Sequence, residues 1–284
     1  MSINWYPGHM AKTRRVIEET LPQIDIVTEV LDARIPQSSR NPDLAKLTEN
    51  KPHVIILNKC DLADPEQNKK WVDYYKKLGY GVMLFDSKTK KASKPSDFAA
   101  VVRETLKEKL ERSAARGIVS KNIRLMILGV PNVGKSTFIN YICGSAKAKA
   151  EDRPGVTRTK QWVPIGNGID MLDMPGMLWG KLTDQDAAHK LAVTGAISDL
   201  VVDTTELSEY LLYILREAYP KTLTERYKLV PPFDEKIHDL FLHVGQKRGY
   251  VLRGGEIDEE RTAAMLLDEF RAGKLGRITL DVLK

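Results

Sequence analysis

The chain has 284 residues, 42% hydrophobic and 29% charged, a composition that excludes intrinsic disorder and allows one large domain or two ordinary ones. The formal net charge of +6 weakly favours a polyanionic partner, such as RNA, and says nothing about the fold. The sequence has no apolar run of the roughly 20 residues needed to span a bilayer and does not begin like a signal peptide, so we expect a cytoplasmic protein without a membrane partner.

Strand and helix patterns alternate over roughly the first 180 residues. After a short basic helix at 12–21, apolar stretches bounded by turn residues predict strands at 24–31, 53–57, 81–85, 123–128, 161–165 and 169–172. Helical patterns lie between them at about 64–78, 96–114 and 135–143. This alternation predicts an α/β fold with a mostly parallel sheet covered by helices on both faces.

The pattern becomes purely helical after about residue 183. Helices are expected at 187–197, 206–219, 234–247 and 258–270. We therefore predict two domains, an α/β domain at 1–182 and a small all-helical domain at 183–284. The two cysteines, Cys60 and Cys143, lack the spacing of metal ligands and are interpreted as reduced thiols.

The strongest local motif is GVPNVGKS at 129–136, directly after an expected strand and before an expected helix. This is a P-loop, in which backbone amides at a helix N-terminus surround phosphate groups. Lys135 would place its charge on the β- and γ-phosphates, which makes it a catalytic candidate, and the Ser136 hydroxyl would be a ligand of Mg²⁺. The predicted phosphate-binding residues are Asn132, Val133, Gly134, Lys135, Ser136 and Thr137.

A second motif, Asn58-Lys59-Cys60-Asp61, follows the expected strand 53–57. The Asp61 carboxylate can accept two hydrogen bonds from the N1 and N2 edge of guanine, whereas adenine offers no such pair of donors. We therefore predict a guanine site formed by Asn58, Lys59 and Asp61. Ser87 and Lys88 follow the strand 81–85 and would form a second loop beside the base, although a plain basic loop at 87–94 remains the alternative.

A third motif, Asp173-Met174-Pro175-Gly176, ends the last expected strand. Asp173 would hold Mg²⁺ through water, and the Gly176 amide would meet the γ-phosphate. Thr157 is the preferred switch residue, with a catalytic role through Mg²⁺ and the γ-phosphate. Thr159 is the second choice, and an exposed polar loop is the alternative to both.

In ordinary small GTPases the P-loop comes first and the Asn-Lys-x-Asp motif last, whereas here 58–61 precedes 129–136. This order resembles that of the circularly permuted GTPases. The segments WYPGHM at 5–10 and DARIP at 32–36 make the chain similar to the ribosome-biogenesis GTPase A family over essentially its whole length.

The resemblance implies a GTP-hydrolysing factor that acts late in the maturation of the large ribosomal subunit. Such a protein would cycle on and off the precursor with its nucleotide state, would contact ribosomal RNA and ribosomal proteins, and would use Mg²⁺ and K⁺. The resemblance also implies that the C-terminal helical domain supplies part of the RNA contact. We further expect a monomer whose hydrolysis is stimulated by ribosomal subunits and by potassium.

The sequence offers three candidates for the group that assists hydrolysis. Met177 stands where Ras-type proteins carry the glutamine that orients the attacking water, and a thioether cannot orient a water in that way. The family's candidate is the histidine of the Tyr-Pro-Gly-His-Met stretch, here His9, although a lone histidine can also be an ordinary surface or core residue. In potassium-activated GTPases an asparagine at the position of Asn132 is a ligand of K⁺, although Asn132 can also simply shape the loop. Arg34 is either an arginine finger or part of a structural ion pair.

Two other functions are compatible with the same motifs. The protein would be a GTP-gated RNA-binding scaffold if hydrolysis were incidental. It would be a signalling or membrane-associated GTPase if it were lipid-anchored, but the last residues, 281–284, carry no lipidation motif.

Overall fold

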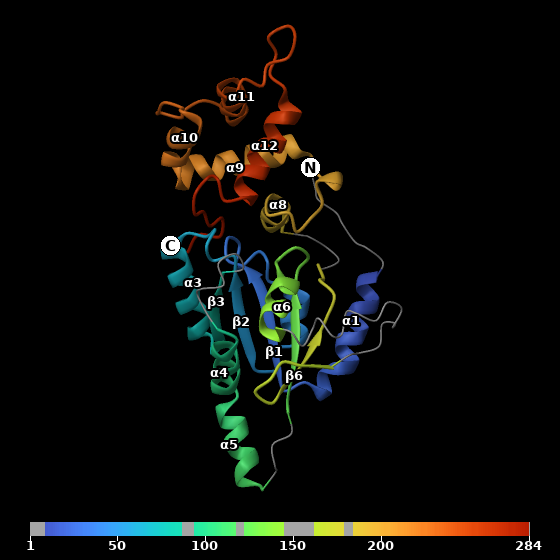
Figure 1. The fold of residues 1–284 in the computed structure, drawn as a ribbon. Helices are drawn as coiled ribbons and strands as arrows, with labels where there is room; N and C mark the ends of the chain where they lie inside the picture. The colour runs from blue at the N-terminus through green and yellow to red at the C-terminus, as the bar shows by residue number, and fades with distance from the viewer. Residues whose placement is uncertain (1–8, 87–93, 118–121, 145–161, 179–183, 284) are drawn as a thin grey trace. The chain divides into compact units, whose positions relative to one another are not determined.

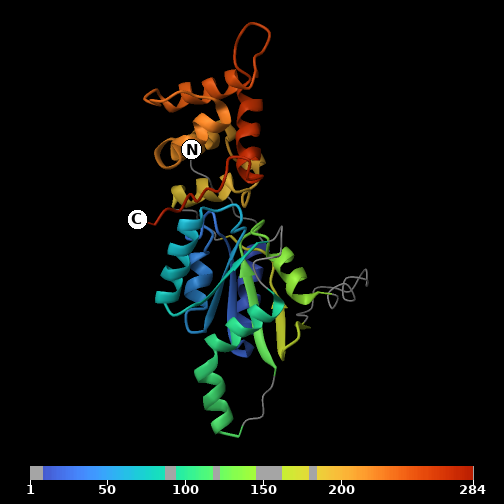
Figure 2. The ribbon, with the colours of Figure 1, turned by 60° about the vertical axis from the view of Figure 1, so that its left-hand side comes forward.

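The computed structural model describes residues 9–86, 94–117, 122–144, 162–178 and 184–283. These residues form two compact units (Figures 1 and 2). We call the described residues 9–178 and 281–283 the sheet unit, and 184–280 the helical unit.

The sheet unit is built on six strands in the order β3-β2-β1-β4-β6-β5. The four neighbouring pairs from β3 to β6 are parallel, which confirms the predicted fold class. Only β5 is antiparallel, because a tight turn at 165–168 joins it to β6 and so short a connection can only form a hairpin. The bounds are β1 Ile26–Asp32, β2 His53–Asn58, β3 Gly81–Phe85, β4 Ile123–Gly129, β5 Trp162–Pro164 and β6 Ile169–Asp173.

The helices of the sheet unit are α1 His9–Thr20, α2 Pro42–Leu47, α3 Pro65–Lys77, α4 Pro95–Thr105, α5 Lys107–Ala115 and α6 Lys135–Cys143. The stretch expected to be helical at 96–114 is helical, but it is divided into α4 and α5, which meet at Leu106. Leu106 is buried at the end of the apolar face of α4, whereas every side chain of α5 is exposed or half-buried. The short α2 was missed, although Asn41 and Pro42 are a typical helix start.

Helices cover both faces of the sheet, because side chains of successive strand residues point to opposite sides. On one face, Trp71 and Tyr75 of α3 pack in a cluster with Leu31 of β1 and Leu57 of β2. On the other, the rings of Phe98 of α4, Phe85 of β3 and Phe138 of α6 pack together. This packing fixes the carboxyl ends of the parallel strands at one edge, where ligands of such sheets bind.

The helical unit packs four helices around α9 Thr204–Ala218. The four are α8 Gln185–Val193, α10 Pro220–Tyr227, α11 Ile237–Lys247 and α12 Glu259–Arg271. The buried Glu269 of α12 accepts hydrogen bonds from Arg226, Arg248 and the Tyr227 hydroxyl. These cations and donors lower the pKa of Glu269, although burial by itself would raise it. This unit is helical as predicted except for an isolated bridge between Val251 and Ile257, and α10 was not anticipated.

The C-terminal residues return to the sheet unit, whereas the sequence placed all of 183–284 in the helical domain. The Trp71 indole donates to the Asp281 carbonyl at 2.8 Å, and the Leu283 amide donates to the Gln67 side chain at 2.8 Å. Leu283 also packs against the hydrophobic cluster beneath α3. A tail this short carries no hydrophobic periodicity from which its position could be predicted, so tertiary contacts determine where it lies. None of the helices in the described ranges has the length and apolar composition needed to cross a bilayer.

Candidate nucleotide site

The P-loop connects β4 to α6 through residues 130–134. Gly134 caps α6 with a φ of +88°, and Asn132 has a φ of +57°. Asparagine is one of the few residues with a side chain that adopt this left-handed region at low cost. These two left-handed residues lead the chain directly into the N-terminus of α6. The first backbone amides of α6 have no partners within the helix, so they can bind an anion.

Gly134 is also required by a close neighbour. A Cβ atom at this position would lie 2.2 Å from the Nδ2 atom of Asn58. The amide group of Asn58 itself donates a 2.7 Å hydrogen bond to the Val133 carbonyl and is fully buried. The P-loop and the Asn-Lys-x-Asp motif are therefore in direct contact, although 75 residues separate Asn58 from Val133.

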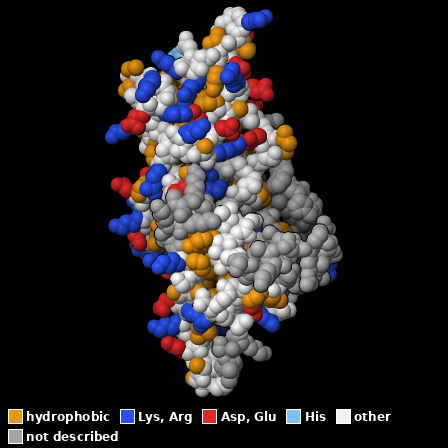
Figure 3. Space-filling view, viewed as in Figure 1, with side chains coloured by type: hydrophobic (Ala, Val, Ile, Leu, Met, Phe, Trp, Pro, Cys, Tyr) orange, Lys and Arg blue, Asp and Glu red, His pale blue; other side chains and the backbone are white. Residues whose placement is uncertain are grey.

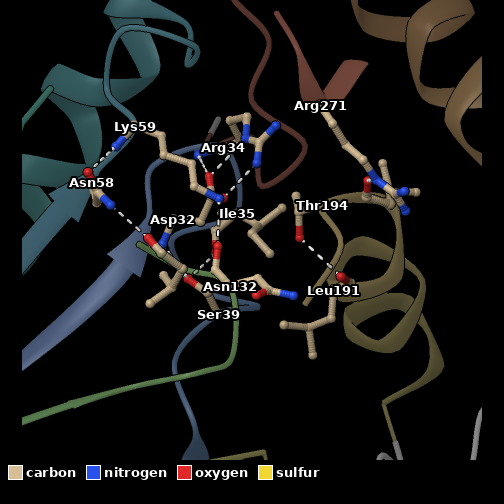
Figure 4. A network of polar contacts seen from close by, with 12 residues as sticks. Asp32, Arg34, Ile35, Ser39, Asn58, Lys59, Asn132, Leu191, Thr194 and Arg271 are labelled. Carbon is tan, nitrogen blue, oxygen red and sulfur yellow. Dashed lines mark hydrogen bonds and ion pairs between the residues drawn. The ribbon is translucent and has the colours of Figure 1, made fainter. Parts of the chain in front are cut away.

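Lys59 makes a second contact between the two motifs (Figure 4). Its Nζ atom donates to the Asn132 carbonyl at 2.9 Å and to Asp32 at 2.9 Å. The sequence grouped Asn58 and Lys59 with the guanine-binding residues. In the structure their side chains hold the P-loop backbone, while Asp61 follows in the turn after β2.

Arg34 belongs to a buried ion pair and is therefore not placed to act as an arginine finger. Its guanidinium donates two hydrogen bonds to the Asp32 carboxylate, at 2.9 and 2.7 Å, and Arg34 is only 2% exposed (Figure 4). A finger must reach a phosphate from an accessible position, whereas this guanidinium is held inside by its partner. Asp32 ends β1 and binds both Arg34 and Lys59. Because Lys59 also donates to the Asn132 carbonyl, this group of three residues helps to hold the P-loop in place.

Burial by itself would raise the pKa of Asp32, but the charges of Arg34 and Lys59 outweigh burial and hold this pKa well below its ordinary 3.8. A carboxyl with a lower pKa in the folded state stabilises the fold above its unfolded pKa. This contribution is lost as the pH falls below about 4, towards the folded pKa.

Lys59→Met is therefore expected to lose stability at a higher pH than the unsubstituted protein, because Asp32 then keeps only one cation and its pKa rises. The measurement is the urea midpoint of unfolding between pH 6 and pH 2.5 for both proteins. Lys69→Met is the matched control, since Lys69 is an exposed residue of α3. Identical acid profiles for all three proteins would contradict the role of Lys59.

A pocket of about 390 Å³ lies over the P-loop. Its size falls within the range of small-molecule sites. The Lys135 ammonium and the Asp173 carboxylate form an ion pair in this pocket. The pocket is lined by Val130, Pro131, Asn132, Lys135, Ser136, Asp173, Met174, Pro175 and Gly176. The structure thus brings the P-loop and the Asp-Met-Pro-Gly motif together around one space.

Gly176 is pressed against the P-loop, since a Cβ atom there would lie 3.1 Å from the backbone nitrogen of Pro131. The absence of a side chain lets the backbone at 176 approach the phosphate loop closely. The hydroxyl of Ser136 and the carboxylate of Asp173 line the same pocket and are the oxygen donors that Mg²⁺ prefers. Within the described residues, no cluster of three or more His, Cys, Asp or Glu side chains is arranged for a metal, so phosphate oxygens would have to complete the shell.

Met177 is buried. Its amide donates to the Gly129 carbonyl at 3.1 Å, and its carbonyl accepts from the Asn41 side chain at 3.1 Å. Asn41 supports the segment that follows Gly176, and this role was not predicted from the sequence. Its helix-capping position was recognisable, but its contact with Met177, 136 residues away, was not.

Several predicted residues lie outside the described residues. These are Ser87, Lys88, Thr157 and Thr159. His9 is the first residue of α1, and its side chain likewise lies outside the described part. Val133, Gly134 and Thr137 lie in the loop and the first turn of α6, as their motif requires. The nucleotide and metal roles of all these residues remain predictions.

Comparison with known proteins supports the identification of the motifs. Residues 124–230 match the family described as 50S ribosome-binding GTPase. The chain is 44% identical to a protein of Priestia megaterium named Ribosome biogenesis GTPase A, over 99% of this chain and 97% of the relative. Two solved structures are similar, GDP-bound YlqF and GNP-bound YlqF from T. maritima, with TM-scores of 0.68 and 0.64. They are 27% and 28% identical, and the matches cover 94% of this chain and 98% and 97% of theirs.

The similarity extends over both units, and the permuted motif order is built into one mostly parallel sheet. An identity of 44% over nearly the full length of both proteins leaves little room for a different fold or a different reaction. The chain therefore belongs to the ribosome biogenesis GTPase A family and is a GTPase.

Proposed function

We propose that this GTPase is an assembly factor that acts in late maturation of the large ribosomal subunit and cycles on and off the precursor with its nucleotide state. The observation that carries the proposal is the near-complete coverage of a relative named for ribosome biogenesis, because it includes the helical unit as well as the GTPase domain. The match to the family described as 50S ribosome-binding GTPase supports the large subunit as the partner.

The charge distribution is compatible with an RNA-containing partner. The net charge is +6, and on the face shown in Figure 3 basic side chains are interspersed with acidic ones. Mixed charge of this kind favours a specific complementary surface over indiscriminate attraction to polyanions. We propose that ribosomal RNA and ribosomal proteins of the large-subunit precursor contact the protein, which acts as a monomer in the cytoplasm.

In the proposed reaction, water attacks the γ-phosphate of GTP held in the pocket, the bond between the γ-phosphorus and the β–γ bridging oxygen breaks, and GDP and inorganic phosphate leave. Lys135 leaves its ion pair with Asp173 and places its ammonium on the phosphates, and the Gly176 amide donates to the γ-phosphate. Ser136 would hold Mg²⁺ directly and Asp173 would hold it through water, and the metal would neutralise phosphate charge. Thr157 would act on Mg²⁺ and the γ-phosphate. Because the Met177 side chain is buried, the chain's own positioning of water is incomplete and intrinsic turnover is slow.

Potassium is proposed to supply positive charge at the P-loop through Asn132. Turnover in KCl is therefore expected to exceed turnover in NaCl at equal ionic strength. Asn132→Gly should remove the difference, since glycine keeps the left-handed backbone of this residue and loses only the side-chain ligand. Phosphate release is measured in both salts for both proteins. Equal rates of the unsubstituted protein in the two salts would leave Asn132 only its loop-shaping role.

His9 is proposed to position the attacking water once the protein is bound to the ribosomal subunit. Positioning and acid–base groups typically contribute about 10²–10⁴-fold, so subunit-stimulated turnover of His9→Ala should fall at least about tenfold. GTP affinity should stay unchanged, because such a group acts mainly in the transition state. Single-turnover hydrolysis is measured with and without large subunits. Near-normal stimulation in His9→Ala would leave the K⁺ ion as the remaining source of assistance, since Arg34 is buried.

The proposed cycle is tested by co-sedimentation with separated ribosomal subunits in GDP and in a non-hydrolysable GTP analogue. We expect binding to the large subunit in the analogue and release in GDP. Hydrolysis rates with and without large subunits then separate a stimulated enzyme from a GTP-gated scaffold whose hydrolysis is incidental. Binding to neither subunit in either nucleotide would overturn the proposal.

A further inference from the structure

Residues 33–41, which we call the bridging loop, connect β1 to α2 and are unusually buried for a loop. Ile35 is fully buried, and Ser39 is 1% exposed. The Ser39 hydroxyl donates to the Ile35 carbonyl at 2.7 Å and accepts from the Asp32 amide at 3.1 Å (Figure 4). The Tyr75 hydroxyl donates to the Pro36 carbonyl from α3. A loop that is buried and internally hydrogen-bonded moves as one body, so a displacement at one end is transmitted to the other end.

One end of the bridging loop is bonded to the Asp-Met-Pro-Gly segment. Asn41 uses its side-chain oxygen to cap α2, at 3.0 and 3.2 Å from the amides of Asp43 and Leu44. Its side-chain nitrogen remains for the Met177 carbonyl, and this contact is buried. Because Met177 directly follows Gly176, the loop is joined to the backbone that is proposed to meet the γ-phosphate.

The middle of the bridging loop is bonded to the C-terminal tail. Ser38 donates twice to the Asp281 carboxylate, from its amide at 2.7 Å and from its hydroxyl at 2.8 Å. Ser38 is 6% and Asp281 5% exposed, so these bonds to a carboxylate are shielded from water and among the stronger kinds of hydrogen bond. Asp281 immediately follows Leu280, the last residue of the helical unit.

We propose that the bridging loop couples the phosphate state of the bound nucleotide to attachment of the C-terminal tail, with Asn41, Ser38 and Asp281 as its positioning residues. The proposal rests on the proposed contact between Gly176 and the γ-phosphate. A γ-phosphate that holds Gly176 also holds Met177, and through Asn41 and Ser38 it holds Asp281. Such coupling is reciprocal, so a firmly attached tail favours GTP over GDP to the same degree. The tail, residues 281–283, is thereby held more firmly within the sheet unit in the GTP state.

The test measures hydrogen exchange of the full-length protein in GDP and in a non-hydrolysable GTP analogue. The Leu283 amide reports attachment of the tail, because it donates to Gln67. We expect its exchange to be at least about fivefold slower with the analogue, the lower end of usual allosteric couplings. The Gly176 amide is followed in the same experiment and reports the phosphate contact itself.

Asn41→Ser is the decisive variant. Serine caps a helix nearly as well as asparagine but is too short to reach the Met177 carbonyl. The nucleotide dependence of Leu283 exchange should disappear, while the thermal midpoint stays close to that of the unsubstituted protein. Ser38→Ala is a second variant that leaves Asn41 intact, and it should accelerate Leu283 exchange and reduce the nucleotide dependence. Asn122→Ser is the matched control, because it removes the hydrogen bonds of Asn122 to Asp170 without touching the loop.

The outcomes separate the coupling from the proposal on which it rests. If the Gly176 amide responds to the analogue and Leu283 does not, the coupling is overturned. It is also overturned if Asn41→Ser keeps the full nucleotide dependence. If Gly176 itself fails to respond, the phosphate contact is wrong and the coupling falls with it. The exchange experiment contains no ribosomal particles, so failure of the coupling leaves the proposed role in subunit assembly standing.

Discussion

Replacing Gly134 with alanine is expected to weaken GTP binding at least about 100-fold, since a strained backbone costs roughly 1–3 kcal/mol and a clash adds to it. The φ of +88° is unfavourable for alanine, and the new Cβ would lie 2.2 Å from the Asn58 side chain. Asn58 is fully buried and bonded to Val133, so the P-loop has to move instead. Equilibrium binding of a fluorescent GTP analogue measures the effect.

Gly79→Ala is the matched control for this prediction. Gly79 has a φ of +83°, and a Cβ there would meet no described atom within 4 Å. Both variants should therefore lose about 1 kcal/mol of stability from the backbone, but only Gly134→Ala should lose nucleotide affinity. Unchanged affinity in Gly134→Ala would show that the contact with Asn58 does not shape the P-loop.

Asp61→Asn is expected to weaken GTP binding at least about 100-fold and to favour xanthosine triphosphate, because a site built to pair with a polar group rejects an analogue that cannot pair. The amide of asparagine can accept from one edge nitrogen of guanine but presents a donor to the other. Xanthine carries a carbonyl at that second position, and an amide donor satisfies it. Competition binding with GTP, ATP and xanthosine triphosphate measures the change in preference.

Asp64→Asn is the control in the same segment. Asp64 caps α3 through the amides of Glu66 and Gln67, and asparagine is an equally good cap. This variant should keep both stability and preference for GTP. If ATP competed as well as GTP for the unsubstituted protein, Asp61 would not be the base-selecting residue.

The sequence by itself was sufficient for the fold class, because its signals are local. Apolar strand patterns at 53–57 and 123–128 are followed directly by polar motifs, and the carboxyl ends of parallel strands meet at one edge of a sheet. Ser136 and Asp173 therefore had to converge, and the structure brings both to one pocket. The permuted order changes where the chain begins and ends, whereas the sheet still brings these motifs to one edge.

The tertiary structure alone decided which side chains support that pocket. Asn58 and Lys59 belong to a base-recognition motif, yet their side chains hold the P-loop backbone. Arg34 could be a finger or an ion-pair partner by sequence, and only its burial beside Asp32 distinguished the two.

The same holds for the C-terminal tail. The contact of Ser38 with Asp281 joins residues 243 positions apart, and no local sequence pattern predicts such a bond. Helix caps, turns and strand periodicity are set by neighbours within a few residues and can be read from the sequence. Long-range hydrogen bonds depend instead on how the completed sheet and α3 place distant segments, so they are determined only when the whole chain has packed.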